Sequence, residues 1–265
     1  MKKTILITGA SSGIGYVIAK KLHEEGFNVF GTSRNPDKVH GDLPFPLLKL
    51  DITDQQSISE FTKIFFEKSP NLDVLINNAG VMLSGISEEV SQSQARDHLE
   101  ANFWGPVNVT QAFLPHFRKQ RHGKIISIGS IMGIVGMPTS GFYAAAKHAL
   151  EGYFKSLRYE VAQFGIGISI VEPSFFKSNI SHSGVQAASS IKDYDNLRTK
   201  ANRFSETSLL NAPDPAAVAV TVLKIVNASR PKLSYPVGNG TTLLPLLQYF
   251  SYNSLENGVK KQIGF

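Results

Sequence analysis

Short apolar, β-branched runs alternate along this chain with longer segments of helical periodicity. The first run covers residues 4–8 and leads into a segment at 14–25, where Val17, Ile18 and Leu22 share one helix face. The runs are apolar throughout, as expected for strands of a parallel sheet that helices cover on both sides. Right-handed crossovers between such strands give a doubly wound sheet. The alternation therefore predicts an α/β protein of the Rossmann type.

The same pattern sets the expected element boundaries. Thr53-x-x-Gln56 matches a capping box, and Asp214-Pro215 places a cap residue before a proline in the first turn of a helix. No linker divides the chain, so residues 1–265 are expected to form a single domain. Seven strands are expected at 4–8, 28–33, 45–50, 73–77, 124–130, 166–171 and 233–237, with helices near 55–68, 88–118, 142–164 and 214–228.

Two segments fall outside this alternation. Residues 178–212 are polar, irregular and longer than most loops, so they form either a lid over a site or a disordered insertion, and we favour the lid. The tail at 240–265 contains an apolar stretch at 243–250. This stretch is suited to pack on a partner, to cover a site or to touch a membrane surface, and packing is the simplest of the three.

Composition excludes several classes of protein. The chain is 42% hydrophobic, which is enough for a sizeable core. Its uncharged stretches at 125–146 and 233–255 are interrupted by glycine and proline, so no membrane span is expected. The net charge of +6 comes without a dense Lys/Arg run, so nucleic acid is not an expected partner. There is no cysteine, and the stretch before the first glycine is too short for a secretory signal, so we expect a cytoplasmic location.

A glycine-rich turn follows the first strand directly and opens the next helix. Glycines in such a turn permit positive φ and close backbone approach, and the free N–H groups at a helix start attract a pyrophosphate. The spacing Gly-x-x-x-Gly-x-Gly differs from the general Gly-x-Gly-x-x-Gly fingerprint, and a tight turn without a ligand is the alternative. The candidate phosphate-binding residues are Gly9, Ser11, Ser12, Gly13, Ile14 and Gly15.

Tyr143 and Lys147 are spaced one helical turn apart, so both side chains project from one helix face. The lysine ammonium is expected to lower the pKa of the tyrosine by favouring the phenolate, which suits a reversible proton carrier. Tyr16 and Lys20 have the same spacing. They lie in the helix after the glycine turn, with no strand-end serine before them, and are interpreted as ordinary amphipathic helix residues.

Ser130 is expected at the end of the strand 124–130, at the edge where open α/β sheets bind ligands. Its hydroxyl is able to donate to a substrate oxygen that gains negative charge. Ser127 lies in the middle of the strand and is interpreted as a satisfied core hydroxyl. Asp97-His98 with Ser130 would suggest a serine hydrolase, but the Gly-x-Ser-x-Gly elbow is absent. The histidines have no metal-ligand spacing, and no metal is expected.

Together, the glycine turn, the segment Asn77-Asn78-Ala79-Gly80, Ser130 and the Tyr143/Lys147 pair resemble the short-chain dehydrogenase/reductase family over roughly residues 3–240. The resemblance implies one domain that both binds the dinucleotide and carries the catalytic residues. It implies a catalytic tetrad of Asn102, Ser130, Tyr143 and Lys147, in which the Asn102 amide holds a water that relays protons through the lysine. It also places Asp51 and Ile52 beside the adenine, and Asn78, Ala79 and Gly80 along the ribose and nicotinamide.

The resemblance extends to residues 172–178, where Pro173, Phe176 and Ser178 are expected to contact the cofactor. The family has a proline–glycine segment here, followed by a hydroxyl residue that meets the carboxamide. Ser174 stands in place of the usual glycine and Ser178 in place of the usual threonine.

The second strand ends in Gly31-Thr32-Ser33-Arg34, where an acidic residue would accept from a ribose 2′-hydroxyl. The guanidinium of Arg34 suits a 2′-phosphate through forked hydrogen bonds, and Ser12 is able to donate one more. A solvated surface arginine is the alternative, and Asp37, beyond Pro36, is the nearest acidic competitor. We therefore expect NADP(H) to be preferred, with NAD(H) possible.

These features predict an oxidoreductase that interconverts a carbonyl and a primary or secondary alcohol by hydride transfer, with Tyr143 as general acid and base. A catalytically silent NADP(H)-binding sensor or scaffold is the alternative. The resemblance is to the hydroxysteroid and retinol dehydrogenase branch, which implies a bulky lipophilic substrate and a homodimer or homotetramer. The candidate substrate walls, which could equally be core or subunit interface, are Met132, Ile134, Met137, Phe142, Phe175 and Phe176.

Overall fold

Seven parallel strands form the central sheet in the order β3-β2-β1-β4-β6-β7-β9, which confirms the predicted doubly wound fold. The structure is a computed structural model, and it describes residues 2–39, 41–177 and 184–264. Because all the strands are parallel, their carboxyl ends meet at one edge, and the strand order reverses between β1 and β4. The strands are β1 (Thr4–Ile7), β2 (Asn28–Ser33), β3 (Leu47–Lys49), β4 (Val74–Asn77), β6 (Gly123–Ile128), β7 (Ile166–Pro173) and β9 (Ser234–Val237).

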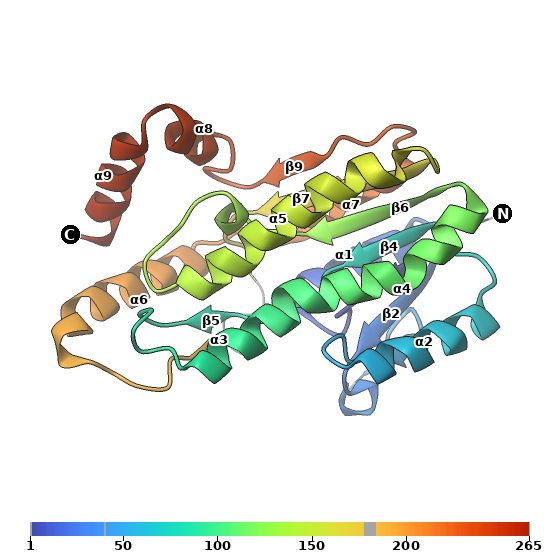
Figure 1. Ribbon diagram of the computed structural model, residues 1–265, viewed down its shortest axis with the longest axis horizontal. Coiled ribbons are helices and arrows are strands. Elements are labelled where there is room, and N and C mark those ends of the chain that lie inside the picture. Colours follow the sequence, from blue (N-terminus) through green and yellow to red (C-terminus); the bar gives the residue numbers. More distant parts are fainter. Residues whose placement is uncertain (1, 40, 178–183, 265) are drawn as a thin grey trace.

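Helices cover both faces of the sheet (Figure 1). They are α1 (Gly13–Glu24), α2 (Gln55–Lys68), α4 (Gly105–Gln120), α5 (Gly141–Ala162) and α7 (Ala216–Asn227). Helices α1 and α7 pack on one face, and α2, α4 and α5 on the other. Residues within a strand alternate between the two cores, so Ile5 and Ile7 join the first and Leu6 joins the second. Both faces are therefore buried, which explains why the strands are apolar throughout.

Phenylalanine side chains fill the core beneath α2 and α4. The ring centroid of Phe65 lies 5.4 Å from that of Phe30, 5.4 Å from that of Phe66 and 5.6 Å from that of Phe113, all in edge-on contacts. Phe65 is completely buried. Edge-to-face contacts add to the burial of these large rings, so Phe65 of α2 links strand β2 to helix α4.

The predicted start of α2 needs a correction. Asp54 is the cap residue, and its carboxylate accepts from the Gln56 N–H at 2.8 Å. Thr53 donates hydrogen bonds from its N–H and its hydroxyl to the Asp51 carboxylate and does not cap the helix. The expected Thr53 capping box is therefore wrong. A carboxylate is at least as good a cap as a hydroxyl and also interacts favourably with the helix dipole. At α7 the prediction is confirmed, because Asp214 accepts from the Ala216 N–H at 2.7 Å.

The long helix expected near 88–118 is divided into three parts. Ser91 and Gln94 form a capping box that starts α3 (Gln92–Leu99), and the π-helical turn η2 (Glu100–Trp104) joins α3 to α4. π-Turns of this kind often occur at functional sites, and this one contains Asn102, which is only 1% exposed. Strand β6 ends at Ile128, so Ser130 lies in the following loop and not in the strand as expected.

The segment 178–212 contains regular structure over most of its described part, so the expectation of an irregular segment is wrong for residues 185–186 and 192–210. Strand β8 (Val185–Gln186) pairs with β5 (Leu83–Ser84), and the short 3₁₀ turn η4 (Lys192–Tyr194) leads into α6 (Asp195–Leu210). The order comes from side-chain contacts, which polarity patterns do not reveal.

The main such contact is a buried ion pair. Arg198 of α6 binds Glu89, whose side chain is 1% exposed, with its Nε 3.2 Å from Oε2. The Ile191 N–H also donates to Glu89 at 2.7 Å. Arg198 and this N–H lower the pKa of Glu89. The carboxylate therefore anchors the 184–210 segment to the rest of the domain.

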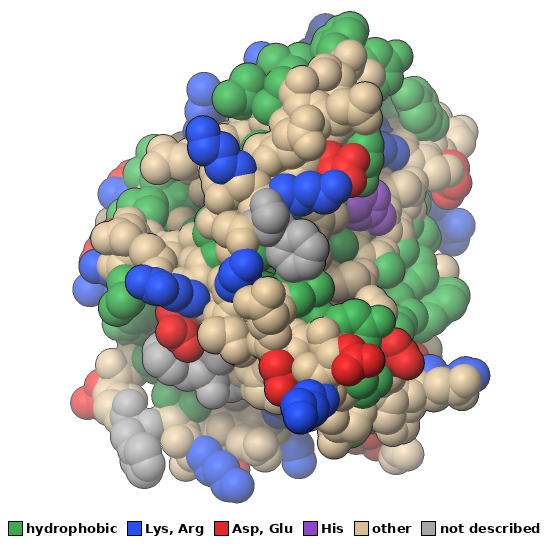
Figure 2. Space-filling model, turned by 90° about the vertical axis from the view of Figure 1, so that its left-hand side faces the viewer, with side chains coloured by type: hydrophobic (Ala, Val, Ile, Leu, Met, Phe, Trp, Pro, Cys, Tyr) green, Lys and Arg blue, Asp and Glu red, His purple; other side chains and the backbone are tan. Residues whose placement is uncertain are grey.

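The C-terminal tail forms α8 (Leu243–Phe250) and α9 (Tyr252–Ile263). Its inner side chains, including Leu244 and Leu247, pack on a cluster that contains Met132 and Tyr143. Figure 2 shows hydrophobic side chains gathered at the top of the molecule, where Figure 1 places α8. Within the described ranges, no helix is long and apolar enough to cross a membrane. The exposed apolar residues of the tail are Leu243, Leu246, Tyr249, Phe250 and Tyr252.

Replacing Phe65 by alanine is expected to lower the free energy of unfolding by roughly 3 to 5 kcal/mol, because it empties a fully buried aromatic site. Urea denaturation followed by circular dichroism measures the change. Ile64→Ala is the matched control, because this neighbouring side chain is 46% exposed and should cost less than about 1 kcal/mol. Equal losses in the two variants would contradict the role assigned to the aromatic cluster.

Candidate active site

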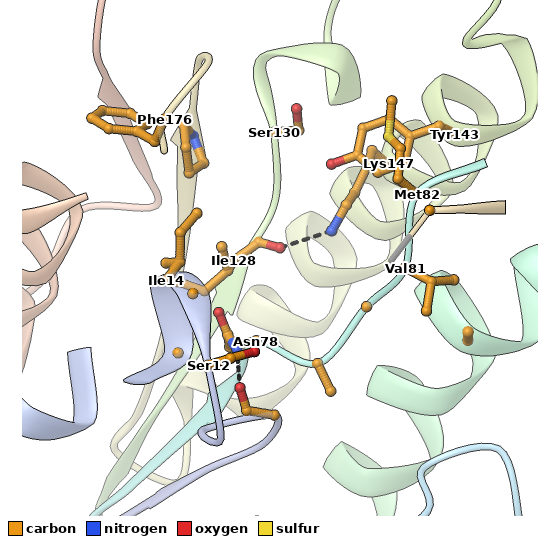
Figure 3. Close-up of a pocket in the computed structure, with 18 of the residues that line it drawn as sticks. Ser12, Ile14, Asn78, Val81, Met82, Ile128, Ser130, Tyr143, Lys147 and Phe176 are labelled. Atoms are coloured by element: carbon orange, nitrogen blue, oxygen red, sulfur yellow. Dashed lines mark hydrogen bonds between the residues drawn. The ribbon is translucent and has the colours of Figure 1, made fainter. Parts of the chain in front are cut away.

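A cavity of about 820 Å³ lies at the carboxyl edge of the sheet (Figure 3). Loops that follow β1, β2, β4, β6 and β7 surround it, and α6 contributes Asn202 and Leu209. The glycine turn, Ser130 and Tyr143 all line this one space. Open α/β sheets bind ligands at this kind of position, outside the strand ends where the strand order reverses.

The glycine turn has the backbone conformation that its sequence requires. Gly9 and Gly13 have φ of 67° and 56°, which favour glycine. A methyl group on Gly15 would lie 2.2 Å from the Gly9 carbonyl oxygen, so only glycine fits there. Ser12 precedes α1 and makes no side-chain capping hydrogen bond, which leaves its hydroxyl and the first helical N–H groups for a ligand. This cradle fits a pyrophosphate.

The glycine turn is tied to the loop after β4. Asn78 donates from its side-chain Nδ2 to the carbonyl oxygens of Thr8 and Gly9, both at 3.0 Å. The Thr8 hydroxyl oxygen accepts from the backbone N–H groups of Asn78 and Ala79, also at 3.0 Å. Asn78, Ala79 and Gly80 all line the cavity. These hydrogen bonds therefore join the two loops expected to hold the cofactor into one continuous wall of the cavity.

The cavity continues past the end of β2. Ser33 and Arg34 line it, and Arg34 is exposed, so its guanidinium is free to meet an anion from solvent. Asp51 and Ile52 line it from the loop after β3, as expected. The Asp51 carboxylate already accepts from the Thr53 N–H and hydroxyl. Asp37, the acidic competitor, does not line the cavity.

Ser130, Tyr143 and Lys147 line the same part of the cavity and are nearly buried. The Ser130 hydroxyl oxygen accepts from the Met132 N–H at 3.1 Å, which leaves its proton to be donated. Lys147 Nζ donates to the Ile128 carbonyl oxygen at 3.0 Å and lies 5.8 Å from the centroid of the Tyr143 ring (Figure 3). The structure therefore brings together three of the four expected catalytic residues around one space.

The charge state of Tyr143 differs from the sequence-based expectation. Burial raises the pKa of the Tyr143 phenol, and its interaction with the Ser130 side chain opposes this rise only in part. The expected lowering of the Tyr143 pKa is therefore wrong for this structure, because burial disfavours the charged phenolate. Burial also lowers the pKa of Lys147, to about 8. Near neutral pH the tyrosine is protonated and the lysine carries its charge.

Asn102, in η2, does not line the cavity, and its side chain is held by protein groups. Its Oδ1 accepts from the Val81 N–H at 3.2 Å, and its Nδ2 donates to the His98 carbonyl oxygen at 3.1 Å. The same Nδ2 lies 3.2 Å from Nδ1 of the His98 ring, which must therefore be neutral to accept. The water relay expected at Asn102 stays a prediction.

The sequence suggests a role for His98 only in a serine hydrolase, and its place beside Tyr143 was not expected. Its ring centroid lies 5.9 Å from that of Tyr143, and its side chain is 3% exposed. Burial, with a smaller effect from Lys147, lowers the pKa of His98 to about 4. Its spacing of four residues before Asn102 is the signal that could have indicated the contact.

Several predicted roles are corrected. Ser127 is fully buried, but its hydroxyl has no hydrogen-bond partner among the described residues, so it is not a satisfied core group. Of the candidate substrate walls, Ile134, Met137 and Phe142 do not line the cavity. Ile134 and Met137 instead pack with residues under α8. Tyr16 packs against Phe45 with ring centroids 6.3 Å apart, away from the catalytic group, as expected.

The remaining predicted contacts come from the segment after β7. Pro173 and Phe176 line the cavity, as does the wall candidate Phe175. Ser178 lies outside the described residues. The side chains of Val81 and Met82, directly after the Asn78–Gly80 segment, also line the cavity and were missed. Met132 is the other wall candidate that lines it.

Comparisons with known proteins agree with this geometry. The profile of the short chain dehydrogenases matches residues 3–188. The 3-ketodihydrosphingosine reductase of Bacteroides thetaiotaomicron is 36% identical over 236 residues, which cover 88% of this chain and 87% of that protein. YusZ, an uncharacterized oxidoreductase of Bacillus subtilis, is 34% identical over an alignment of 278 residues and 99% of both chains.

Solved structures show the same similarity. A short-chain dehydrogenase from Streptomyces avermitilis superposes with a TM-score of 0.84 at 29% identity, over 98% of this chain and 97% of that one. ElxO, solved with NADP bound, gives a TM-score of 0.73 at 28% identity, over 89% of this chain and 98% of that one. The fold and the site define a nicotinamide-dependent oxidoreductase that acts on CH–OH groups. The chain belongs to the short-chain dehydrogenase/reductase family.

The buried His98 should make the fold acid-sensitive. Its pKa is about 4 in the folded state and about 6.5 when unfolded, so the unfolded state takes up the proton first and stability falls as the pH drops through this window. In His98→Gln, the loss of unfolding free energy between pH 7 and pH 4.5 should be smaller by roughly 2 kcal/mol. Urea denaturation at pH 7 and pH 4.5 measures the difference. His122→Gln is the exposed control, and the idea fails if both variants keep the wild-type pH dependence.

Proposed function

We propose that this protein is an NADP(H)-dependent reductase that interconverts a carbonyl group and a primary or secondary alcohol on a lipophilic substrate. The observation that carries the proposal is that Ser130, Tyr143 and Lys147 line the same cavity as the glycine turn. When bound there, the nicotinamide supplies or accepts the hydride. The chain's own residues bind the substrate oxygen and move the proton.

Each side chain has a distinct task in reduction. Ser130, whose oxygen is already occupied by the Met132 N–H, donates its proton to the substrate oxygen. Tyr143 is kept protonated by burial and transfers its proton to that oxygen as negative charge develops. The Lys147 ammonium stabilises the phenolate that remains. A water held at Asn102 returns a proton through the lysine.

The protonated tyrosine favours reduction as the direction of catalysis. A raised pKa makes the phenol a weaker acid, but it keeps the proton on Tyr143 at neutral pH, so the form that reduction needs is present, whereas alcohol oxidation needs the phenolate as a base.

Tyr143→Phe removes the proton donor and should reduce turnover of a reducible ketone by at least about 1,000-fold, because general acid catalysis is lost. NADPH binding should stay within about threefold of wild type, as measured by fluorescence titration. Tyr16→Phe is the matched control, since it alters the other Tyr-x-x-x-Lys motif, and it should retain full turnover. Undiminished turnover in Tyr143→Phe would refute the mechanism.

A panel of ketones, aldehydes and quinones, assayed by loss of NADPH absorbance, separates this proposal from the sensor alternative. Turnover of any of them that is lost in Tyr143→Phe supports the enzyme. Tight NADPH binding with no turnover across the panel would favour a sensor or scaffold.

The cofactor is proposed to be NADP(H), with NAD(H) a weaker substitute. Arg34 is an exposed cation on the cavity wall, and Asp37, which would suit a 2′-hydroxyl, does not line it. The similarity to ElxO, solved with NADP, supports the same choice. A guanidinium pairs well with a phosphate dianion and gains little from an uncharged ribose hydroxyl.

Arg34→Ala should therefore raise the KM for NADPH by roughly 10- to 100-fold and that for NADH by less than about threefold, because one charge-assisted contact is lost only with the phosphate. Steady-state kinetics with both cofactors measure this. Lys38→Ala removes a nearby exposed cation that does not line the cavity and should leave both values unchanged. Equal increases for the two cofactors would rule out a phosphate contact at Arg34.

The substrate is proposed to be lipophilic, in the manner of the hydroxysteroid and retinol dehydrogenases. Apolar side chains surround the catalytic group, and a relative that is 36% identical is a 3-ketodihydrosphingosine reductase. We propose that the segment 178–212 is the lid, since α6 lines the cavity and Glu89 anchors it. The apolar lining residues include Val81, Met82, Ile131, Met132, Phe175, Phe176 and Leu209.

The assembly and location are proposals as well. Trp104 and Tyr159 are large exposed aromatic side chains, 49% and 83% accessible, at the start of α4 and on α5. Such side chains are common at subunit interfaces, which supports a homodimer or homotetramer that pairs through these helices. The absence of cysteine supports a cytoplasmic location.

A further inference from the structure

A buried carboxyl group lies one turn beyond the catalytic lysine. Tyr143, Lys147 and Glu151 follow one another at intervals of four residues, so they share one face of α5. Glu151 is 3% exposed. Its side chain lies under the loop that carries Ser130, because a methyl group on Gly129 would be 3.3 Å from Glu151 Oε1.

The ionisable groups around Glu151 come from two elements. On α5 they are Lys147, His148 and Lys155, and Lys155 Nζ reaches in from the surface to 3.0 Å from Oε2. On β7 it is Glu172, which is 2% exposed and accepts from the Ser234 hydroxyl at 2.7 Å.

Three of the other elements near Glu151 add no charge to it. The turn η3 (Ile131–Gly133) contains no ionisable residue, and β6 ends nearby in Ile128. The one ionisable residue of β9, Tyr235, packs in the core on the opposite face of the sheet. Helix α3 and the turn η2 also pack on α5, and they bring Arg96, Asp97, His98 and Glu100, of which His98 interacts with Lys147.

A carboxyl group here is costly for folding. Oε1 of Glu151 accepts no hydrogen bond from the described residues, and a buried polar atom without a partner destabilises a fold by about 1 to 3 kcal/mol. Leucine or methionine would fill the same volume without this cost. Burial next to a charged lysine thus points to a role for the carboxylate in the chemistry of that lysine.

We propose that Glu151 is a positioning residue for proton transfer, whose carboxylate keeps Lys147 in the ammonium form, and that Glu172 tunes this effect by repelling charge on Glu151. The inference rests on the proposed function, in which the Lys147 ammonium stabilises the Tyr143 phenolate.

Electrostatics support this arrangement. Burial lowers the pKa of Lys147 to about 8, and Glu151 is the group that opposes the fall. Burial, with Glu151 adding to it, raises the pKa of Glu172 to about 7. Burial raises the pKa of Glu151 itself, while Lys155 lowers it. The three groups are therefore linked through charge within the pH range in which an enzyme works.

The two carboxyl groups are tested separately, because removing their charges should shift the pKa of Lys147 in opposite directions. Glu151→Gln keeps the shape and removes the charge, so the pKa of Lys147 should fall and the alkaline limb of kcat/KM for ketone reduction should move down by roughly 0.5 to 1 pH unit. At pH 8 this is a loss of about 2- to 5-fold, with a smaller change at pH 6. Glu172→Gln removes the repulsion and should move the limb upward. Glu160→Gln, at an exposed position on the same helix, is the matched control and should not move it.

A second readout does not depend on turnover. NMR titration of lysine labelled with ¹³C at Cε, with the Lys147 signal assigned from Lys147→Arg, gives the pKa of Lys147 directly. If the protein reduces no carbonyl compound, the proposed function fails while this titration still tests the inference. A lower Lys147 pKa in Glu151→Gln and a higher one in Glu172→Gln support it.

An unchanged Lys147 pKa in Glu151→Gln overturns the inference, even where thermal stability changes, because a purely structural role would alter stability alone. Should the glutamine variant fail to fold, Glu151→Asp replaces it. That variant keeps the charge and should hold the Lys147 pKa within about 0.3 unit of wild type, and Glu172→Gln should still raise it. If Glu151→Asp shifts the Lys147 pKa by more than this, or if Glu172→Gln does not raise it, the inference is also overturned.

Discussion

The bonds between the glycine turn and the loop after β4 are the interaction on which the site depends. Thr8 and Gly9 are held to Asn78 and Ala79 by four hydrogen bonds, and Val81 in turn donates to Asn102. A parallel sheet brings strand ends to one edge, but it does not fix the loops that leave them. These hydrogen bonds fix the loops after β1 and β4 relative to each other. The two loops then form one continuous surface from the glycine turn toward α5.

Helix α5 carries several buried polar groups beside the cavity. Tyr143, Lys147 and Glu151 are all nearly buried on one face of α5, with His98 beside them. Burial disfavours the charged form of each. The result is a protonated phenol, a lysine that titrates near pH 8 and a histidine that stays neutral. The low dielectric that makes these groups costly for folding also strengthens their action on one another.

Sequence patterns could predict the sheet, the glycine turn and most of the side chains that line the cavity, because these follow from local rules. Strand order follows from apolar runs and crossover handedness, and the glycine turn from positive φ and close approach. The pattern failed where a distant side chain decides the outcome. Glu89 orders a segment about a hundred residues away through Arg198, and the sign of the Tyr143 pKa shift depends on burial, which spacing does not encode. Ser127 shows the same limit, since strand position alone could not tell whether its hydroxyl has a partner.

The attachment of α6 has a consequence for how such a protein diversifies. The wall that α6 contributes to the cavity is joined to the rest of the chain by the Arg198–Glu89 ion pair, the ring contact of Phe204 with Phe175 and packing on α9, and the strand pair before it, β5–β8, lies outside the main sheet. Mutations in α6 are therefore free to reshape what enters the cavity without disturbing the dinucleotide cradle. One inherited scaffold could in this way acquire new substrates through drift in a peripheral module, while the machinery for moving hydride is preserved.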